Sequence, residues 1–258
     1  MSDLECELKG QVFEISLNRI EKNNAFDDEL LRIMQSSLEK AIQDPAVSVI
    51  LLRANGRHFS AGADLQWMQR MAQFTQEENL ADAMILAKLM NTLYSCPKPT
   101  IAAVQGAAYG GGVGLVAACD IAIAGHSARF CFSEVKLGLI PAVISPYIIK
   151  AIGERLTKWL FMSAEVFDGE QAKQYNLVHH YIDDYLLDSF ALDYASKLSH
   201  LAPQAIIDCK SLIERVASRP IDEQLIEETA AIIAAKRVSE EGQRGLHAFL
   251  NKEPPNWN

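Results

Sequence analysis

The stretch YGGGVGLVAACD, residues 109–120, places three consecutive glycines at the start of an apolar run. Residues 99–106, PTIAAVQG, precede it and resemble a short buried strand, so the expected order is strand, tight glycine turn and helix. A helix start exposes unused backbone N–H groups and the positive end of the helix dipole, and glycine lets a ligand approach closely. An electron-rich group is therefore expected there, either a phosphate or an oxygen on which negative charge develops.

The run GVGLVA, residues 112–117, also satisfies the G-x-G-x-x-G/A pattern of a dinucleotide-binding turn. Dinucleotide-binding folds present that turn in their first strand-to-helix step, with an acidic residue about 20 positions later that holds a ribose. Here the turn begins near residue 110, and Glu134, at the right offset from Gly114, lies in a segment with a different interpretation. Chance explains this six-residue match better, and a dehydrogenase is a remote alternative.

A second turn with a glycine, HFSAGADL at residues 58–65, links the apolar run VSVILLR, residues 47–53, to another helix. For either turn alone, tight strand-to-helix geometry is a sufficient explanation of the glycine. If the two turns face each other, the backbone N–H groups of Ala63 and Gly111 converge and form an oxyanion hole with two donors. Such a site stabilises a carbonyl oxygen that becomes an enolate, and it needs no side chain.

The composition of the 258-residue chain narrows the classes of protein. Hydrophobic residues make up 49%, enough for a large core, and the net charge of −9 disfavours a nucleic-acid partner, which would need a basic face. The chain shows neither a signal-peptide pattern nor an apolar run of the roughly 20 residues that span a bilayer, so we expect a cytoplasmic protein without a membrane partner. Five scattered cysteines without a C-x-x-C pair predict free thiols and no metal site.

Strand patterns fill the front of the chain, and helical patterns fill the back. A β-hairpin and a helix over residues 27–44 precede the strand 47–53, and Thr75 with Glu78 predicts a capping box for a helix that runs towards Tyr94. Further helices are expected over residues 146–152, 168–175 and 184–201, and in three segments around Pro203, Pro220 and Ser239. We expect a core over residues 1–200 and a helical region over residues 201–258 that packs on neighbouring subunits.

Several segments together resemble one known family. They are HFSAGADL (58–65), AAVQGAAYGGGVGLVAACDIAIA (102–124), ARFCFSEVKLGLIP (128–141) and the tail EEGQRGLHAFLNKEPPNWN (240–258). In order and spacing they resemble the enoyl-CoA hydratase/isomerase family, also called the crotonase family, over essentially the whole chain. The resemblance implies an α/β fold, a crotonase-like (ClpP/crotonase) spiral of β-β-α units. It also implies a helical C-terminal region used for assembly into a homotrimer or a homohexamer of two trimers.

The resemblance implies roles for single residues as well. The family's oxyanion donors fall on Ala63 and Gly111, and its second catalytic glutamate falls on Glu134. Coenzyme A enters as part of an acyl-CoA substrate, so no separate cofactor is expected. The residues implied to bind this substrate are Ala61, Asp64 and Gly110 at the turns, Arg19 and Lys22 near the adenosine phosphates, and Phe249 and Lys252 from a neighbour's tail.

The sequence departs from the family at two points. Family hydratases with two catalytic glutamates carry the first one three places after the oxyanion glycine, where this chain has Gly114. Glu134 is then the only carboxylate that the motif places near the acyl chain, which suits hydration in two half-steps and also a double-bond isomerase. In place of a G-A-G-G-T turn, residues 138–156 read GLIPAVISPYIIKAIGERL, which resembles a branch of bacterial methylglutaconyl-CoA hydratases of leucine breakdown.

We therefore expect hydration of a 2-enoyl-CoA thioester with a short or branched acyl group, with 3-methylglutaconyl-CoA among the candidates. An isomerase that uses the single glutamate is the main alternative. A non-catalytic acyl-CoA binder is a remote one, because a pocket that only binds has little use for a carboxylate that faces an apolar chain. His58 and Tyr109, beside the two turns, are candidates for orienting water, although a loop histidine and a packed tyrosine explain them better.

Overall fold

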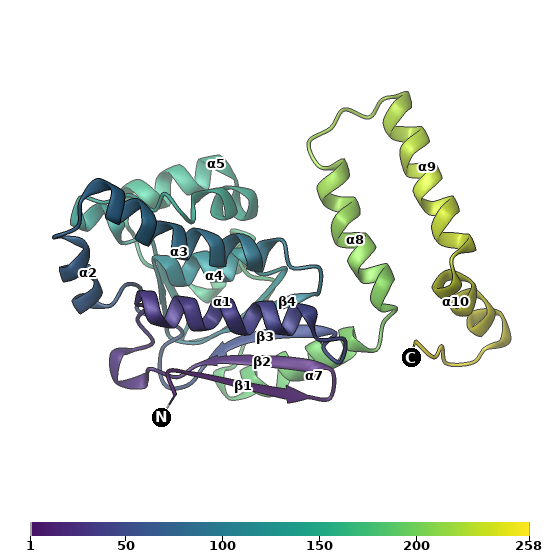
Figure 1. Ribbon diagram of the computed structural model, residues 1–258, viewed down its shortest axis with the longest axis horizontal. Coiled ribbons are helices and arrows are strands. Elements are labelled where there is room, and N and C mark those ends of the chain that lie inside the picture. Colours follow the sequence, from purple (N-terminus) through teal and green to yellow (C-terminus); the bar gives the residue numbers. More distant parts are fainter. Residues whose placement is uncertain (1, 258) are drawn as a thin grey trace. The chain divides into compact units, whose positions relative to one another are not determined.

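The computed structural model describes residues 2–257, and the chain divides into two compact units (Figure 1). The first unit ends at Ser196 and contains both β-sheets. The second begins at Lys197, whereas the sequence suggested a boundary between residues 200 and 201.

Six strands form the main sheet, in the order β1-β2-β3-β4-β6-β9. The strand β1 is antiparallel to β2, and the later pairs are parallel. Because β3 and β4 lie in the middle and are buried almost throughout, they read as continuous apolar runs in the sequence. The strands are β1 (Leu4–Lys9), β2 (Val12–Leu17), β3 (Val49–Ala54), β4 (Thr100–Val104), β6 (Ile121–Gly125) and β9 (His180–Ile182).

A smaller sheet contains β5 (Ala107–Tyr109), β7 (Arg129–Cys131) and β8 (Phe167–Asp168). The chain passes from β4 in the main sheet to β5 in the small sheet and then into helix α4 (Gly111–Ala118). It repeats this course through β6 and β7 to helix α5 (Ser145–Ser163). An isolated bridge between Ser60 and Ala108 adds the residues after β3 to the small sheet. This repetition is the predicted spiral of β-β-α units.

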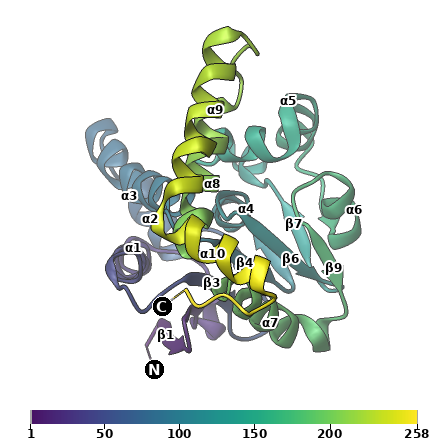
Figure 2. The same cartoon turned by 90° about the vertical axis from the view of Figure 1, so that its right-hand side faces the viewer.

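Helices cover one face of the main sheet, where α1, α3 and α5 lie in successive rows (Figure 1). The helix α1 (Asp28–Gln43) begins where Asp27 accepts a hydrogen bond from the Leu30 N–H. Its buried face consists of Leu30, Leu31, Met34, Leu38 and Ala41. This unit also contains α2 (Leu65–Met71), α3 (Gln76–Tyr94) and α6 (Gly169–Gln174), which lies against β7 and β9 (Figure 2). Helix α7 (Leu187–Ser199) begins in this unit, and its last three residues belong to the second. The apolar core fills the space between this helical layer and the sheet.

The sequence predicted the starts of two helices correctly, but it predicted the end of one helix too early. The capping box of Thr75 and Glu78 is present at the start of α3, and Asp168 caps α6 as predicted. The helix expected over residues 146–152 continues to Ser163 after a kink at Gly153, whose φ of 78° and ψ of 161° are not helical. The sequence prediction ended at that glycine and missed the second half.

The second unit consists of α8 (Pro203–Val216), α9 (Glu223–Val238) and α10 (Glu240–Asn251). The ammonium group of Lys236 on α9 pairs with Asp208 on α8 at 2.9 Å and with Glu241 on α10 at 2.8 Å, so one side chain links all three helices. Many large apolar side chains of this unit are exposed, among them Ile213 and Ile226. Within residues 2–257, no helix is both long and apolar enough to cross a membrane.

Candidate active site: two backbone turns and one carboxyl group

The turn after β3 is held by backbone pairing on both sides. On one side, the Phe26 N–H donates to Gly62 O and the Asp64 N–H donates to Phe26 O, both at 2.7 Å. On the other side, the Tyr109 N–H donates to Ser60 O at 2.9 Å. The φ of Gly62 is +97°, which a side chain rarely allows. This pairing pattern uses the N–H groups around Ala63 but not its own.

The turn after β5 reverses the chain at Gly110, whose φ is 52° and ψ is −119°. The Gly110 N–H donates to Cys131 O at 2.9 Å, and Gly110 O accepts the N–H groups of Val113 and Gly114 at 3.0 and 3.3 Å. Helix α4 therefore begins with the Gly111 N–H outside its own hydrogen-bond pattern. Within residues 2–257, neither the Gly111 N–H nor the Ala63 N–H donates to any acceptor.

The two turns are neighbours in the small sheet. The bridge between Ser60 and Ala108 joins their strands, and a Cβ atom built on Gly62 would lie 3.4 Å from Tyr109 O. The unused N–H groups of Ala63 and Gly111 therefore lie in two turns that are joined by the Ser60–Ala108 bridge. Convergence of these two N–H groups on one oxygen, as a two-donor oxyanion hole needs, stays a prediction.

The third component is Glu134, the first residue of the short 3₁₀ helix η2 (Glu134–Leu137) that follows β7. Its carboxyl group lies over the second turn, because a Cβ atom on Gly110 would be 3.1 Å from Glu134 Oε1. The other oxygen, Oε2, is buried and has no hydrogen-bond partner among the described residues. Burial raises the pKa of Glu134 above its usual range, and a hydrogen bond with its own backbone partly opposes that rise.

These three components suit proton transfer next to a carbonyl group. Backbone donors stabilise an oxygen that gains negative charge, and a carboxyl group with a raised pKa is a stronger proton acceptor than an ordinary one and can return the proton afterwards. An unpartnered buried oxygen is costly in a group that serves only the fold, so its presence beside the two turns favours a role in chemistry.

His58 belongs to the scaffold of the first turn. Its Nδ1 accepts a hydrogen bond from the Ala107 N–H at 3.0 Å, which fixes the ring with its remaining proton on Nε2. Burial lowers the pKa of His58, and the charge of Arg57 lowers it further. The half-buried His58 ring thus joins the first turn to β5 of the small sheet. It differs from the solvated loop histidine that the sequence suggested.

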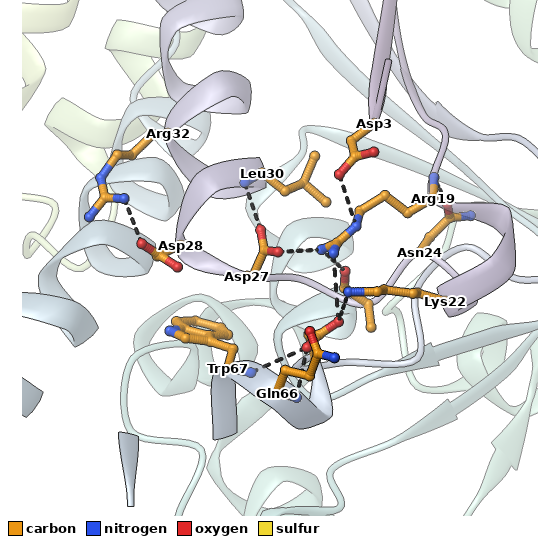
Figure 3. Close-up of polar contacts among 12 residues, drawn as sticks. Asp3, Arg19, Lys22, Asn24, Asp27, Asp28, Leu30, Arg32, Gln66 and Trp67 are labelled. Carbon is orange, nitrogen blue, oxygen red and sulfur yellow. Dashed lines mark hydrogen bonds and ion pairs between the residues drawn. The ribbon is translucent and has the colours of Figure 1, made fainter. Parts of the chain in front are cut away.

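The predicted phosphate-binding residue Arg19 lies inside the protein (Figure 3). It is 4% exposed, and its guanidinium group pairs with Asp3 at 3.0 Å, Asp27 at 2.9 Å and Asp64 at 3.6 Å. The side chain of Lys22 is 36% exposed and pairs with Asp64 at 2.9 Å. Of the two predicted basic residues, Lys22 thus reaches solvent, whereas the three carboxylates engage Arg19.

Asp64 begins the helix that follows the first donor. Its side chain accepts the N–H groups of Gln66 at 2.8 Å and Trp67 at 3.2 Å, which caps α2. Burial alone would raise the pKa of Asp64, but the hydrogen bond from Lys22 and the two backbone N–H groups outweigh it, so the pKa is lowered. The ionised carboxylate therefore fixes the backbone directly after Ala63.

Asn24 is a site residue that the sequence analysis missed. It is 1% exposed and has a φ of 54°; its side chain donates to the carbonyls of Asn55 and His58 and accepts the Arg19 N–H. These bonds join the start of the first turn to the residues after β2. The Asn-Asn pair at residues 23–24 was the available signal, because asparagine tolerates a left-handed backbone.

The other predicted site residues are divided between the two units. Ala61 is exposed in the first turn, where its N–H donates to Asn23 O at 3.0 Å. Phe249 lies on α10 with 81% of its surface exposed, and Lys252 ends that helix, so both belong to the second unit. Their expected contact with a neighbour's substrate stays a prediction. Among residues 2–257, no group of three His, Cys, Asp or Glu side chains is placed to hold a metal ion.

The apparent dinucleotide pattern has a packing explanation. Gly112 and Gly114 lie within α4, after its first residue, and not in the turn that precedes the helix. A Cβ atom on Gly112 would be 3.1 Å from the Cβ of Ser60, so glycine permits the close approach of the two turns. The motif match reflects helix packing and does not require a nucleotide.

Comparisons with known proteins agree with this geometry. The family described as enoyl-CoA hydratase/isomerase matches residues 7–258. A crystal structure from Legionella pneumophila, described as an enoyl-CoA hydratase/isomerase (crotonase), is 61% identical with a TM-score of 0.98 over 100% of both chains. The 2,3-dehydroadipyl-CoA hydratase of Escherichia coli is 32% identical over 100% of this chain and 99% of its own. The mitochondrial methylglutaconyl-CoA hydratase of Mus musculus is 32% identical over 98% of this chain and 81% of its own.

Proposed function

Because this chain belongs to the enoyl-CoA hydratase/isomerase family and hydrates enoyl-CoA thioesters, we propose that Glu134 alone carries out both proton transfers of the reaction. In this proposal the N–H groups of Ala63 and Gly111 hold the thioester oxygen. The observation that carries it is the buried, unpartnered Oε2 of Glu134 beside the turn that bears the Gly111 donor.

Hydration proceeds in two half-steps under this proposal. The ionised Glu134 accepts a proton from water as the water oxygen bonds to Cβ of the substrate, and the electron pair of the double bond moves towards the carbonyl to form an enolate. The Ala63 and Gly111 N–H groups stabilise the enolate oxygen, where the charge develops. The protonated Glu134 then donates its proton to Cα, which restores both the carbonyl and the carboxylate.

A raised pKa is what a single acid/base needs here. A carboxyl group with an ordinary pKa near 4.3 is a weak acceptor and is seldom protonated at neutral pH. The burial that raises the pKa of Glu134 brings its two protonation states closer in free energy, so that one group serves in both half-steps.

The acyl group is proposed to be short or branched. One relative is named for 2,3-dehydroadipyl-CoA and another for methylglutaconyl-CoA, and residues 138–156 resemble the branch that acts on the latter. Crotonyl-, 3-methylcrotonyl-, 2,3-dehydroadipyl-, 3-methylglutaconyl- and a 3-enoyl-CoA therefore form the test panel, with products separated by chromatography and identified by mass.

Each outcome of this panel experiment is distinct. A product heavier by one water from any 2-enoyl thioester supports the proposal. Conversion of the 3-enoyl to the 2-enoyl thioester without a hydrated product would contradict it and favour the isomerase. Binding of the thioesters without any conversion would favour a non-catalytic binder.

We also propose that the second unit assembles the protein into a homotrimer or homohexamer and brings Phe249 and Lys252 to a neighbour's coenzyme A. The exposed apolar side chains of α8 to α10 support this, because an isolated surface rarely leaves so many uncovered. Light scattering tests it, and a fully active monomer at micromolar concentration would contradict it. We propose a cytoplasmic location, to be tested by cell fractionation.

A further inference from the structure

Gly114 is enclosed by side chains of two other helical segments. A Cβ atom at this position would overlap the γ2 methyl group of Ile144, and it would lie 2.9 Å from the Cβ of Ile144 and 3.0 Å from the Cε of Met90. Both neighbours are buried, with 2% and 0% of their surface exposed. The space of a side chain at residue 114 is therefore already occupied, chiefly by Ile144.

The contact between α3 and α4 extends to Gly111, whose N–H is the proposed oxyanion donor. A Cβ atom on Gly111 would meet the ring of Phe26 at 3.4 Å and a methyl group of Leu86 at 3.7 Å. Leu86 and Met90 lie four residues apart on α3, so one face of α3 runs along α4 from Gly111 to Gly114. Ile144, directly before α5, closes the far end of this seam.

We propose that Ile144 is a positioning residue of the hydratase site, whose β-branched side chain presses on Gly114 and holds the first turn of α4, with its Gly111 donor, in place. The proposal rests on the oxyanion hole proposed above. A side chain at residue 114 would lean towards the helix N-terminus, over the turn that faces Glu134. Ile144 excludes such a side chain and keeps this wall of the site apolar.

The geometry assigns this role to the branch at Cβ of Ile144, because the γ2 methyl is the atom nearest to Gly114. Ile144→Leu keeps the number of carbons and removes that branch, whereas Ile144→Val keeps the branch and removes only the δ1 methyl. Ile148→Leu makes the same change one turn later in α5, at a residue that is 0% exposed. It is the matched control for loss of core packing.

The experiment measures kcat, KM and Tm of these variants with the panel thioester that the wild type hydrates fastest. We expect Ile144→Leu to lower kcat about 10-fold and to leave KM within about 2-fold of the wild type. A displaced donor stabilises the transition state less well, and it affects substrate binding less. Ile144→Val should stay near the wild-type kcat. Ile148→Leu should lower Tm by a similar amount while it keeps kcat.

A second set of variants, Gly114→Ala and Ile144→Gly made singly and together, tests the proposal if Ile144→Leu does not fold. Gly114→Ala should lower Tm in the wild type and lower it less in an Ile144→Gly background, which lacks the two atoms nearest to the added Cβ. Equal kcat in Ile144→Leu and Ile148→Leu, or the same Tm loss from Gly114→Ala in both backgrounds, would overturn the positioning role alone. A wild type that hydrates no panel member would overturn the proposed function as well.

Discussion

Two acidic residues, Asp64 and Glu134, flank the candidate site, and their surroundings shift their pKa values in opposite directions. Asp64 is 5% exposed and pairs with Arg19 and Lys22. Hydrogen bonds from Lys22 and from two backbone N–H groups outweigh its burial and lower its pKa. Glu134 has a buried oxygen that no described residue contacts by a hydrogen bond, and burial raises its pKa. The paired carboxylate gives up its proton readily, and the unpaired one holds it more tightly.

This difference separates a carboxylate with a structural role from one with a proposed catalytic role. A buried charge with several partners fixes the backbone, and here it fixes the residues on either side of the Ala63 donor. A buried carboxyl oxygen without a hydrogen-bond partner, such as Oε2 of Glu134, destabilises the fold but raises the pKa of the group. Changes at the two residues should therefore move different observables.

The largest effect is expected from Glu134→Gln. The amide keeps the size of the side chain but cannot transfer the proton, and one acid/base group contributes roughly 10²–10⁴-fold to a rate. Because the proposed mechanism uses Glu134 in both half-steps, we expect a loss of kcat at or above the upper end of that range. Initial rates with the panel thioesters measure it, and hydration at the wild-type rate would refute the mechanism.

Removal of the buried cation should affect the fold before the chemistry. Arg19→Met leaves Asp3, Asp27 and Asp64 without their shared partner, and breaking a buried ion pair costs roughly 3–5 kcal/mol of unfolding free energy. Urea unfolding followed by circular dichroism measures this cost. Arg32→Met, which removes an exposed pair with Asp28, is the control and should change stability by less than about 1 kcal/mol. Similar stabilities of the two variants would contradict the structural role of Arg19.

The backbone donor can be removed with little change in shape. Gly111 is the first residue of α4, a position that proline favours, so Gly111→Pro mainly deletes the N–H. Loss of one oxyanion donor costs about 10²–10³ in kcat. Gly111→Ala keeps the N–H and places its Cβ in ordinary contact with Phe26 at 3.4 Å, so it should retain most activity. Equal rates for these two variants would remove Gly111 from the oxyanion hole.

The smallest effect concerns stability against pH. The raised pKa of Glu134 means that the folded state binds its proton more tightly than the unfolded state, so this residue costs stability as the pH rises from the usual glutamate pKa through the folded one. Above that window, Glu134→Gln should unfold at a higher temperature than the wild type. An unchanged or lower Tm at neutral pH would show that Glu134 has a stabilising partner.

Sequence reasoning reached the local features of this molecule and missed those made by distant residues. The capping box at Thr75 and the two glycine turns are written in adjacent residues, so they could be predicted. The carboxylates around Arg19 come from residues 3, 27 and 64, and its surroundings are not visible in the local sequence. Likewise, Ile144 meets Gly114 only because α4 and α5 pack together.

A single titration tests the contrast most directly. Carbon-13 NMR of protein labelled at the side-chain carboxyl carbons of Asp and Glu follows both groups together, and Glu134→Gln and Asp64→Asn assign the two signals. We predict that Glu134 titrates above the usual glutamate pKa of about 4.3 and that Asp64 titrates below the usual aspartate pKa of about 3.9. A Glu134 pKa at or below its usual value would contradict the account of an unpaired carboxyl group poised for proton transfer.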